Sequence, residues 1–197
     1  PPTVGVPVWT HGELTDTSAA ERSEDEGEVT GTIALNYHWN DDLMTYARYS
    51  RGYRAGAFNN GLVYLDEGDR AYADPEFIDA YEIGLKSEYF DGIMRLNGAA
   101  FYYDYADQQF VNQIGVSAIL ENAGSVDIYG LELELLAVPT DNLTLQAGLG
   151  LIDAEYQELE LTGVDLSGNE PVSSPELNFN IAADYVFDIG SSWETRI

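Results

Sequence analysis

Residues 49–59 read Tyr-Ser-Arg-Gly-Tyr-Arg-Ala-Gly-Ala-Phe-Asn, and residues 81–86 read Tyr-Glu-Ile-Gly-Leu-Lys. In the strand parts of both phrases, apolar or aromatic residues alternate with polar ones, which is the period of a β-strand whose two faces differ. The segment between them is rich in glycine and acidic residues, including Asp66-Glu67-Gly68-Asp69. The two phrases therefore predict that one strand ends, a long loop follows and a second strand begins.

The same alternation recurs along most of the chain and predicts an all-β fold, an antiparallel meander of about seven to eight strands. Asp91-Gly92 stands between two alternating segments and is a strong hairpin signal. The alternating segments cover about residues 29–39, 43–50, 81–89, 94–102, 129–135, 143–151 and 177–187, and a last strand begins at Trp193.

The connections between these strands alternate in length. Residues 40–42, 91–92, 139–142 and 188–192 form short connections, whereas residues 53–77, 108–124 and 157–174 form long ones. Outer-membrane barrels have short periplasmic turns and long extracellular loops. Aromatic residues flank both kinds of connection, as in the two aromatic belts of such barrels. These features predict part of a transmembrane β-barrel, with Asp79 and Asp153 near strand ends on its lipid face.

Composition excludes several classes of function. The net charge is −27 with only eight basic residues, so binding to a polyanion such as a nucleic acid is not expected. Cysteine is absent, which removes disulfides, thiolate metal sites and cysteine nucleophiles. No nucleophile phrase and no pair of histidines at ligand spacing is present, so we expect no catalytic residue, no metal site and no cofactor.

The opening phrases resemble the late-barrel segment of TonB-dependent outer-membrane receptors. Residues 94–109 resemble a strand of that family that ends in an aromatic-rich phrase. Residues 122–125 and 129–134 resemble its Asn-Ala-Gly phrase and its Tyr-Gly phrase with alternating glutamates. Asp153-Ala154-Glu155-Tyr156, Leu166-Ser167-Gly168-Asn169 and Ser174-Pro175 follow in the family's order, so the resemblance covers about residues 29–187.

The resemblance implies a fragment of a receptor. Residues 1–27 are expected to be a polar extracellular loop or flank, and residues 28–197 a partial barrel from which the plug domain and the final strands are absent. The implied function is energised uptake of a scarce nutrient, a ferric siderophore or similar metal chelate, and not catalysis. The implied partners are TonB, reached through the plug domain, and outer-membrane lipid and lipopolysaccharide. The implied location is the outer membrane of a Gram-negative bacterium.

Two other interpretations fit the strand pattern. One is a passive porin or a small closed eight-stranded barrel. The other is a soluble all-β carbohydrate-binding module, because single strands with one polar face also build sandwiches.

Arginines cluster near the predicted extracellular mouth. Arg51, Arg54 and Arg70 are candidate substrate-binding residues, since guanidinium groups bind anionic chelates through charge-assisted hydrogen bonds. Alternatively they pair with loop carboxylates such as Asp74 or with lipopolysaccharide phosphates. Glu82 and Lys86 are expected to join a network across neighbouring strands, whose other members are Arg95, Glu132 and Glu134.

Overall fold

The computed structural model describes residues 27–59, 72–114, 117–188 and 194–196. These residues form strands and connecting segments. Among them there is no helix long and apolar enough to cross a membrane.

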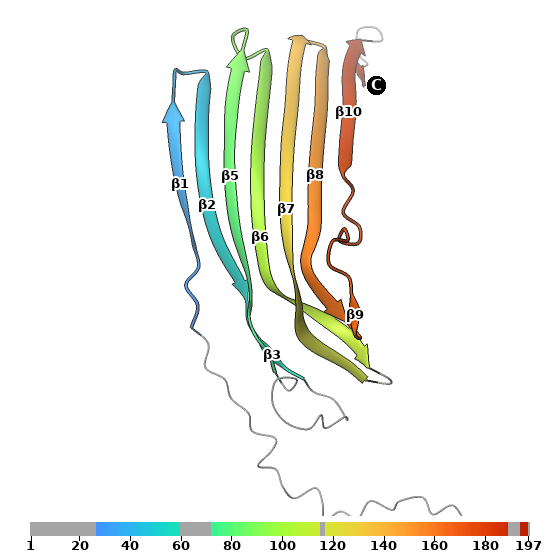
Figure 1. Cartoon of the computed structure of the whole chain (residues 1–197). Coiled ribbons are helices and arrows are strands. Elements are labelled where there is room, and N and C mark those ends of the chain that lie inside the picture. The colour runs from blue at the N-terminus through green and yellow to red at the C-terminus, as the bar shows by residue number, and fades with distance from the viewer. Residues whose placement is uncertain (1–26, 60–71, 115–116, 189–193, 197) are drawn as a thin grey trace, which may run out of the picture.

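Eight strands succeed one another in the main sheet, and each pairs antiparallel with the next, which confirms the predicted meander (Figure 1). They are β1 (Gly31–His38), β2 (Leu43–Arg54), β5 (Glu76–Tyr89), β6 (Met94–Ile114), β7 (Ser117–Thr140), β8 (Leu143–Leu161), β10 (Leu177–Asp188) and β11 (Glu194–Arg196). Three short strands lie outside this path. β3 (Ala57–Phe58) pairs with β4 (Tyr72–Ala73), and β9 (Val164–Asp165) folds back onto β8.

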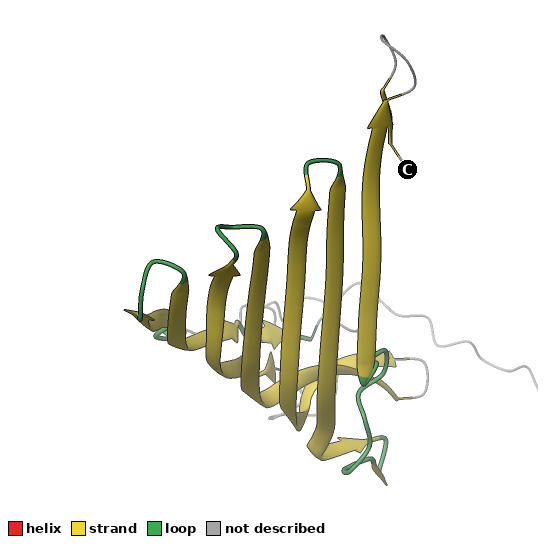
Figure 2. Cartoon of the chain, turned by 90° about the horizontal axis from the view of Figure 1, so that it is seen from above, coloured by secondary structure: helices red, strands yellow, loops and turns green. Residues whose placement is uncertain are grey.

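The sheet is an open wall. β1 and β10 lie at opposite sides of it in both views (Figures 1 and 2). Within the described ranges, β1 pairs only with β2, and β11 pairs only with β10. The described strands therefore do not close into the small eight-stranded barrel that the sequence left open.

The register gives the sheet two different faces, because directly paired residues point to the same side. One row crosses seven strands and is wholly apolar: Leu35, Ala47, Ile83, Ala100, Leu131, Leu151 and Leu177. Leu35 is 73% exposed and Ile83 is 64% exposed, although both lie well inside their strands. We call this side the apolar face. The opposite side carries Arg48, Glu82, Glu132 and Glu134 and is called the charged face.

A row of four tyrosines crosses the apolar face next to this apolar row. Tyr49, Tyr81, Tyr102 and Tyr129 are paired directly across β2, β5, β6 and β7. Their successive ring centroids are 5.1, 6.1 and 4.7 Å apart, which is the range of favourable aromatic contact. A second aromatic group, including Tyr37 and Trp39, lies at the end with the short turns. The apolar band is thus flanked by aromatic residues on both sides.

Two tyrosines beside this row do not belong to it. Tyr103 and Tyr105 are on the charged face, where Tyr103 stacks on Phe101 at 4.6 Å and Tyr105 donates a hydrogen bond to Glu76. Strand alternation explains this, because Tyr102 and Tyr103 are neighbours and must point to opposite sides.

The predicted loop at residues 108–124 is wrong. β6 and β7 continue past the tyrosine row as a paired hairpin whose register runs to Ile114 and Ser117. β8 likewise extends to Leu161 before it turns into β9. The register shifts near Gln108, where Asp107 has a φ of 55°, and the hairpin bends there (Figure 1). Residues such as Phe110 and Val111 favour strand pairing, and the pairing satisfies backbone groups that a loop would leave to water.

Glycines in the sequence phrases make room for aromatic rings on the charged face. A Cβ on Gly84 would come within 2.6 Å of the Tyr46 ring, and a Cβ on Gly130 would overlap the Phe101 ring. Gly150 on the neighbouring strand has no atom closer than 3.9 Å to such a Cβ.

We predict that Gly130→Ala lowers the free energy of unfolding of the full-length protein by about 1–3 kcal/mol, because the Phe101 ring must leave its position. Urea unfolding followed by gel mobility without heating measures the loss. Gly150→Ala is the matched control and should change little. The double change Gly130→Ala with Phe101→Ala should cost less than the sum of the two single changes, and strict additivity would contradict the proposed contact.

Candidate ligand-binding site

The end of the sheet at which β2 leads toward β5 and β8 leads toward β10 carries the long connections and is called the mouth end (Figure 1). Polar networks lie on the charged face. On β2 and β5, Glu82 accepts hydrogen bonds from Arg48 and from the Tyr46 hydroxyl, the latter at 2.6 Å. Glu82 therefore belongs to a cross-strand network, as expected. The other expected members differ, since Arg95 pairs with Glu88 at 2.7 Å near a short turn and Glu134 accepts a hydrogen bond from Asn97.

Glu76 is the centre of the network at the mouth end. Its side chain is buried, and the residue is only 3% exposed. The carboxylate accepts hydrogen bonds from the Tyr105 hydroxyl at 2.7 Å and from the Gln109 backbone N–H at 2.6 Å, and Arg54 lies 3.4 Å away. A buried charge is costly unless it is paired and hydrogen-bonded. These donors from β2 and β6 therefore fix the start of β5.

The candidate arginines do not share one surface. Arg54 is on the charged face, beside Glu76. Arg51 is on the apolar face, where it pairs with Asp79 at 2.6 Å and stacks over the Phe77 ring at 4.9 Å. Arg70 lies outside the described residues. The prediction that these three arginines bind substrate stays a prediction. In the described chain, Arg51 and Arg54 pair with strand carboxylates and not with the loop residue Asp74.

Three amide side chains connect the segments after β2 and before β5 to the β6–β7 hairpin. Asn59 donates to the Leu120 carbonyl and accepts from the Leu120 N–H, both at 2.7 Å. Asn122 makes the same two-way contact with Asp74, at 2.9 and 2.7 Å. Gln109 donates to the carbonyls of Ala55 and Asp74.

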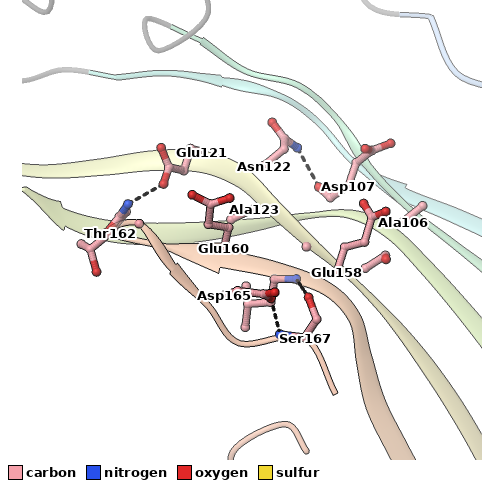
Figure 3. A pocket seen from close by; sticks show the side chains of 15 residues that line it. Ala106, Asp107, Glu121, Asn122, Ala123, Glu158, Glu160, Thr162, Asp165 and Ser167 are labelled. Atoms are coloured by element: carbon pink, nitrogen blue, oxygen red, sulfur yellow. Dashed lines mark hydrogen bonds between the residues drawn. The ribbon is translucent and has the colours of Figure 1, made fainter. Parts of the chain in front are cut away.

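A polar groove of about 1130 Å³ lies between the β6–β7 hairpin and the end of β8 (Figure 3). Carboxylates from four strands line it: Asp107, Glu121, Glu158, Glu160 and Asp165. Glu121 accepts a hydrogen bond from the buried Asn112, and Asn122 donates to the Asp107 carbonyl at 2.6 Å. The groove is therefore acidic, with side-chain amides among its lining groups.

An apolar cluster supports the groove. Val126, Tyr156 and Leu159 are buried, and Phe110 and Leu166 pack against them. The segment after β9 is fastened to β8, because the N–H of Leu166 bonds the Leu159 carbonyl at 2.7 Å and the N–H of Gly168 bonds the Tyr156 carbonyl at 2.8 Å. Hydrogen bonds from Ser167 hold the pKa of Asp165 below its ordinary value, so this carboxylate stays charged.

The described ranges contain no cluster of three or more histidine or acidic side chains that could hold a metal ion. The groove's acidic groups are thus spread over its walls and do not form a coordination site.

Sequence reasoning missed Glu76, the three amides and the acidic groove. A signal existed for the three amides. Asn59 ends the opening phrase, Gln109 ends the phrase at residues 94–109, and Asn122 begins the Asn-Ala-Gly phrase, so all three stood in segments that carry the resemblance. Glu76 had no comparable signal, because it lies 33 positions from its partner Gln109 and meets it only in the folded sheet.

An antiparallel wall with one exposed apolar face, one charged face and a polar mouth defines a segment of a membrane β-barrel. A family model described as "TonB dependent receptor-like, beta-barrel" matches residues 9–196. The chain therefore belongs to the family of TonB-dependent receptor barrels, as the sequence phrases indicated. This is a family of receptors and transporters.

Individual relatives agree with this assignment. The pesticin receptor of Yersinia enterocolitica is 29% identical over 126 residues, which are 63% of this chain and 18% of the relative. The ferric yersiniabactin uptake receptor FyuA of Yersinia pestis superimposes with a TM-score of 0.66 at 25% identity, over 83% of this chain and 24% of that one. BauA, the ferric preacinetobactin receptor of Acinetobacter baumannii, has the same fold, with a TM-score of 0.63 at 19% identity over 82% and 23%. The chain spans about a fifth of the length of these proteins.

We predict that Glu76→Gln destabilises the full-length protein by about 1–3 kcal/mol, because an amide N–H₂ would face one of the buried donors that the carboxylate now accepts from. Glu88→Gln is the matched control. Its carboxylate is 44% exposed and pairs with Arg95 in solvent, where such a pair contributes little. Urea midpoints of the two variants measure the difference, and equal midpoints would contradict the role given to Glu76.

Proposed function

We propose that this chain forms part of the barrel wall of an outer-membrane receptor that takes up a scarce nutrient with energy supplied through TonB. The proposed substrate is a ferric siderophore or a similar metal chelate. The proposed location is the outer membrane of a Gram-negative bacterium, where the apolar face contacts lipid and the tyrosine row lies near the lipopolysaccharide. TonB would act through a plug domain that lies outside this chain.

The observation that carries the proposal is the membership of the chain in a family of receptors. The polar groove at the mouth end gives such a receptor a place for a ligand. The relatives named above are receptors for pesticin and for ferric siderophores. A surface groove of this size can hold a ligand of several hundred daltons.

The two alternative interpretations have less support. A small closed barrel would need its first and last strands to pair, and the described strands remain open. A soluble module would bury its apolar rows, whereas Ile33, Ile83 and Ile181 are 74%, 64% and 79% exposed.

Uptake by cells tests the function. The full-length protein is produced in a strain without its own siderophore receptors, and ⁵⁵Fe-loaded yersiniabactin, preacinetobactin and pyoverdine are supplied separately. We expect accumulation of at least one chelate in cells with TonB and a proton gradient, and surface binding alone in cells without TonB. Accumulation that continues without TonB would contradict the energised mechanism.

The arginine prediction is tested on the same cells. Arg54 faces the charged side, so we expect Arg54→Gln to weaken chelate binding about tenfold, the effect of losing one charge-assisted hydrogen bond. Arg70→Gln is expected to act in the same direction. Arg51→Gln tests the remaining candidate, whose side chain lies on the apolar face. Arg95→Gln, on the charged face near a short turn, is the control, and equal binding by all four variants would remove the arginines from the site.

A further inference from the structure

The segments flanking β3 and β4 lie beside the β6–β7 hairpin without joining its sheet. In the described ranges, β3 pairs with β4 alone and β7 pairs with β6 and β8. In the described chain, residues 55–59 and 72–74 therefore have no strand pairing with the hairpin. Side chains make several of the contacts that hold them there.

Amide side chains supply hydrogen bonds of the kind that strand pairing would otherwise make. A primary amide carries a donor and an acceptor side by side, as a peptide group does. Asn59 uses both groups on Leu120, and Asn122 uses both groups on Asp74, so each reproduces the two-bond pattern of an antiparallel pair. The joined residues are 61 and 48 positions apart in the chain. We call the contact of residues 55–59 and 72–74 with the β6–β7 hairpin the junction. The Asn59 side chain crosses it toward the hairpin, and the Asn122 side chain crosses it from the hairpin.

Two buried residues, Gln109 and Glu76, also belong to the junction. Gln109 is 8% exposed and donates from its side chain to the carbonyls of Ala55 and Asp74, while its backbone N–H donates to Glu76. Both sides of the junction therefore share one hydrogen-bond network around the buried Glu76 and Gln109, and the exposed Arg54 side chain joins it through Glu76.

Asn122 also takes part in the groove. Its side chain lines the groove and donates a second hydrogen bond to the Asp107 carbonyl, another lining residue (Figure 3). A single amide group thus connects the groove wall to the segment that precedes β5.

We propose that Asn59 and Asn122 are positioning residues that hold the segments after β2 and before β5 against the β6–β7 hairpin, so that Arg54 and the acidic groove keep a fixed relative position for ligand capture. Neither residue need touch the ligand. The part of this proposal that concerns ligand capture rests on the proposed function. The mechanical part, which is that the two amides hold the segments against the hairpin, does not.

Hydrogen exchange on the ligand-free, full-length receptor tests the mechanical part. Asn59→Asp and Asn122→Asp keep the size of the side chain but remove the donor and place a carboxylate against backbone carbonyls. In each variant we expect exchange to rise about fivefold, as for one lost hydrogen bond, in peptides from both sides of the junction, residues 55–59 or 72–76 and residues 118–124. Asn40→Asp is the matched control, because the Asn40 side chain accepts a hydrogen bond from the Asp42 N–H at a short turn and a carboxylate keeps that role. Unchanged exchange on either side of the junction would overturn the proposal.

Chelate binding tests the second part. With whichever ⁵⁵Fe-loaded chelate the wild-type receptor binds, both variants should bind about fivefold more weakly with normal surface amounts, and the double variant should be little worse than either single one, because the two amides act on one junction. If Asn122→Asp does not reach the outer membrane, Asn59→Ala makes the same test by removing the partly buried contact with Leu120. Raised exchange with wild-type affinity would overturn the positioning role. If exchange is raised and the wild-type receptor takes up none of the chelates, the proposed function is refuted but the structural role of the two amides is supported.

Discussion

In-register pairing of consecutive strands is the constraint on which the rest of this structure depends. Side chains alternate with a period of two, so a shift of one residue would move every apolar row to the charged side. The row from Leu35 to Leu177 crosses seven strands without a break, and the charged face follows from it. Glu76 meets Tyr105 and Gln109, and Asn122 meets Asp74, only because this register holds. The site is therefore a product of the sheet and not of any one loop.

The sequence predicted the strands, their order and the two faces, since all three depend on local alternation that can be read from neighbouring residues. It did not predict how far the strands continue. The alternation weakens beyond Gln108, where a bulge changes the side to which residues point. Pairing between the two long segments replaces the missing local signal, and that pairing is visible only in three dimensions. The same reason explains why residues 108–124 were expected to be a loop.

The arginines show a further limit of reading charge from composition. Arg51 and Arg54 are three residues apart, an odd spacing that puts them on opposite faces of β2. Each pairs with a carboxylate on β5, so these two members of the basic cluster form separate ion pairs in the structure. The surface that remains at the mouth is acidic, in keeping with the chain's net charge of −27. Alternation could have separated the arginines in advance, but their partners required the register.

The β6–β7 hairpin is longer than a membrane crossing requires. β6 has 21 residues and β7 has 24, whereas a strand needs only about 9–11 residues to cross the hydrocarbon layer. At about 3.3 Å per residue, the roughly 11 residues of β6 that remain extend about 35 Å beyond such a crossing. The ribbon is held at two levels, by the Glu76 network near the bulge and by the contact of Asn59 with Leu120, three residues before the pairing ends at Ser117. A force applied near the tip is therefore shared with a segment that lies 61 positions away in the chain.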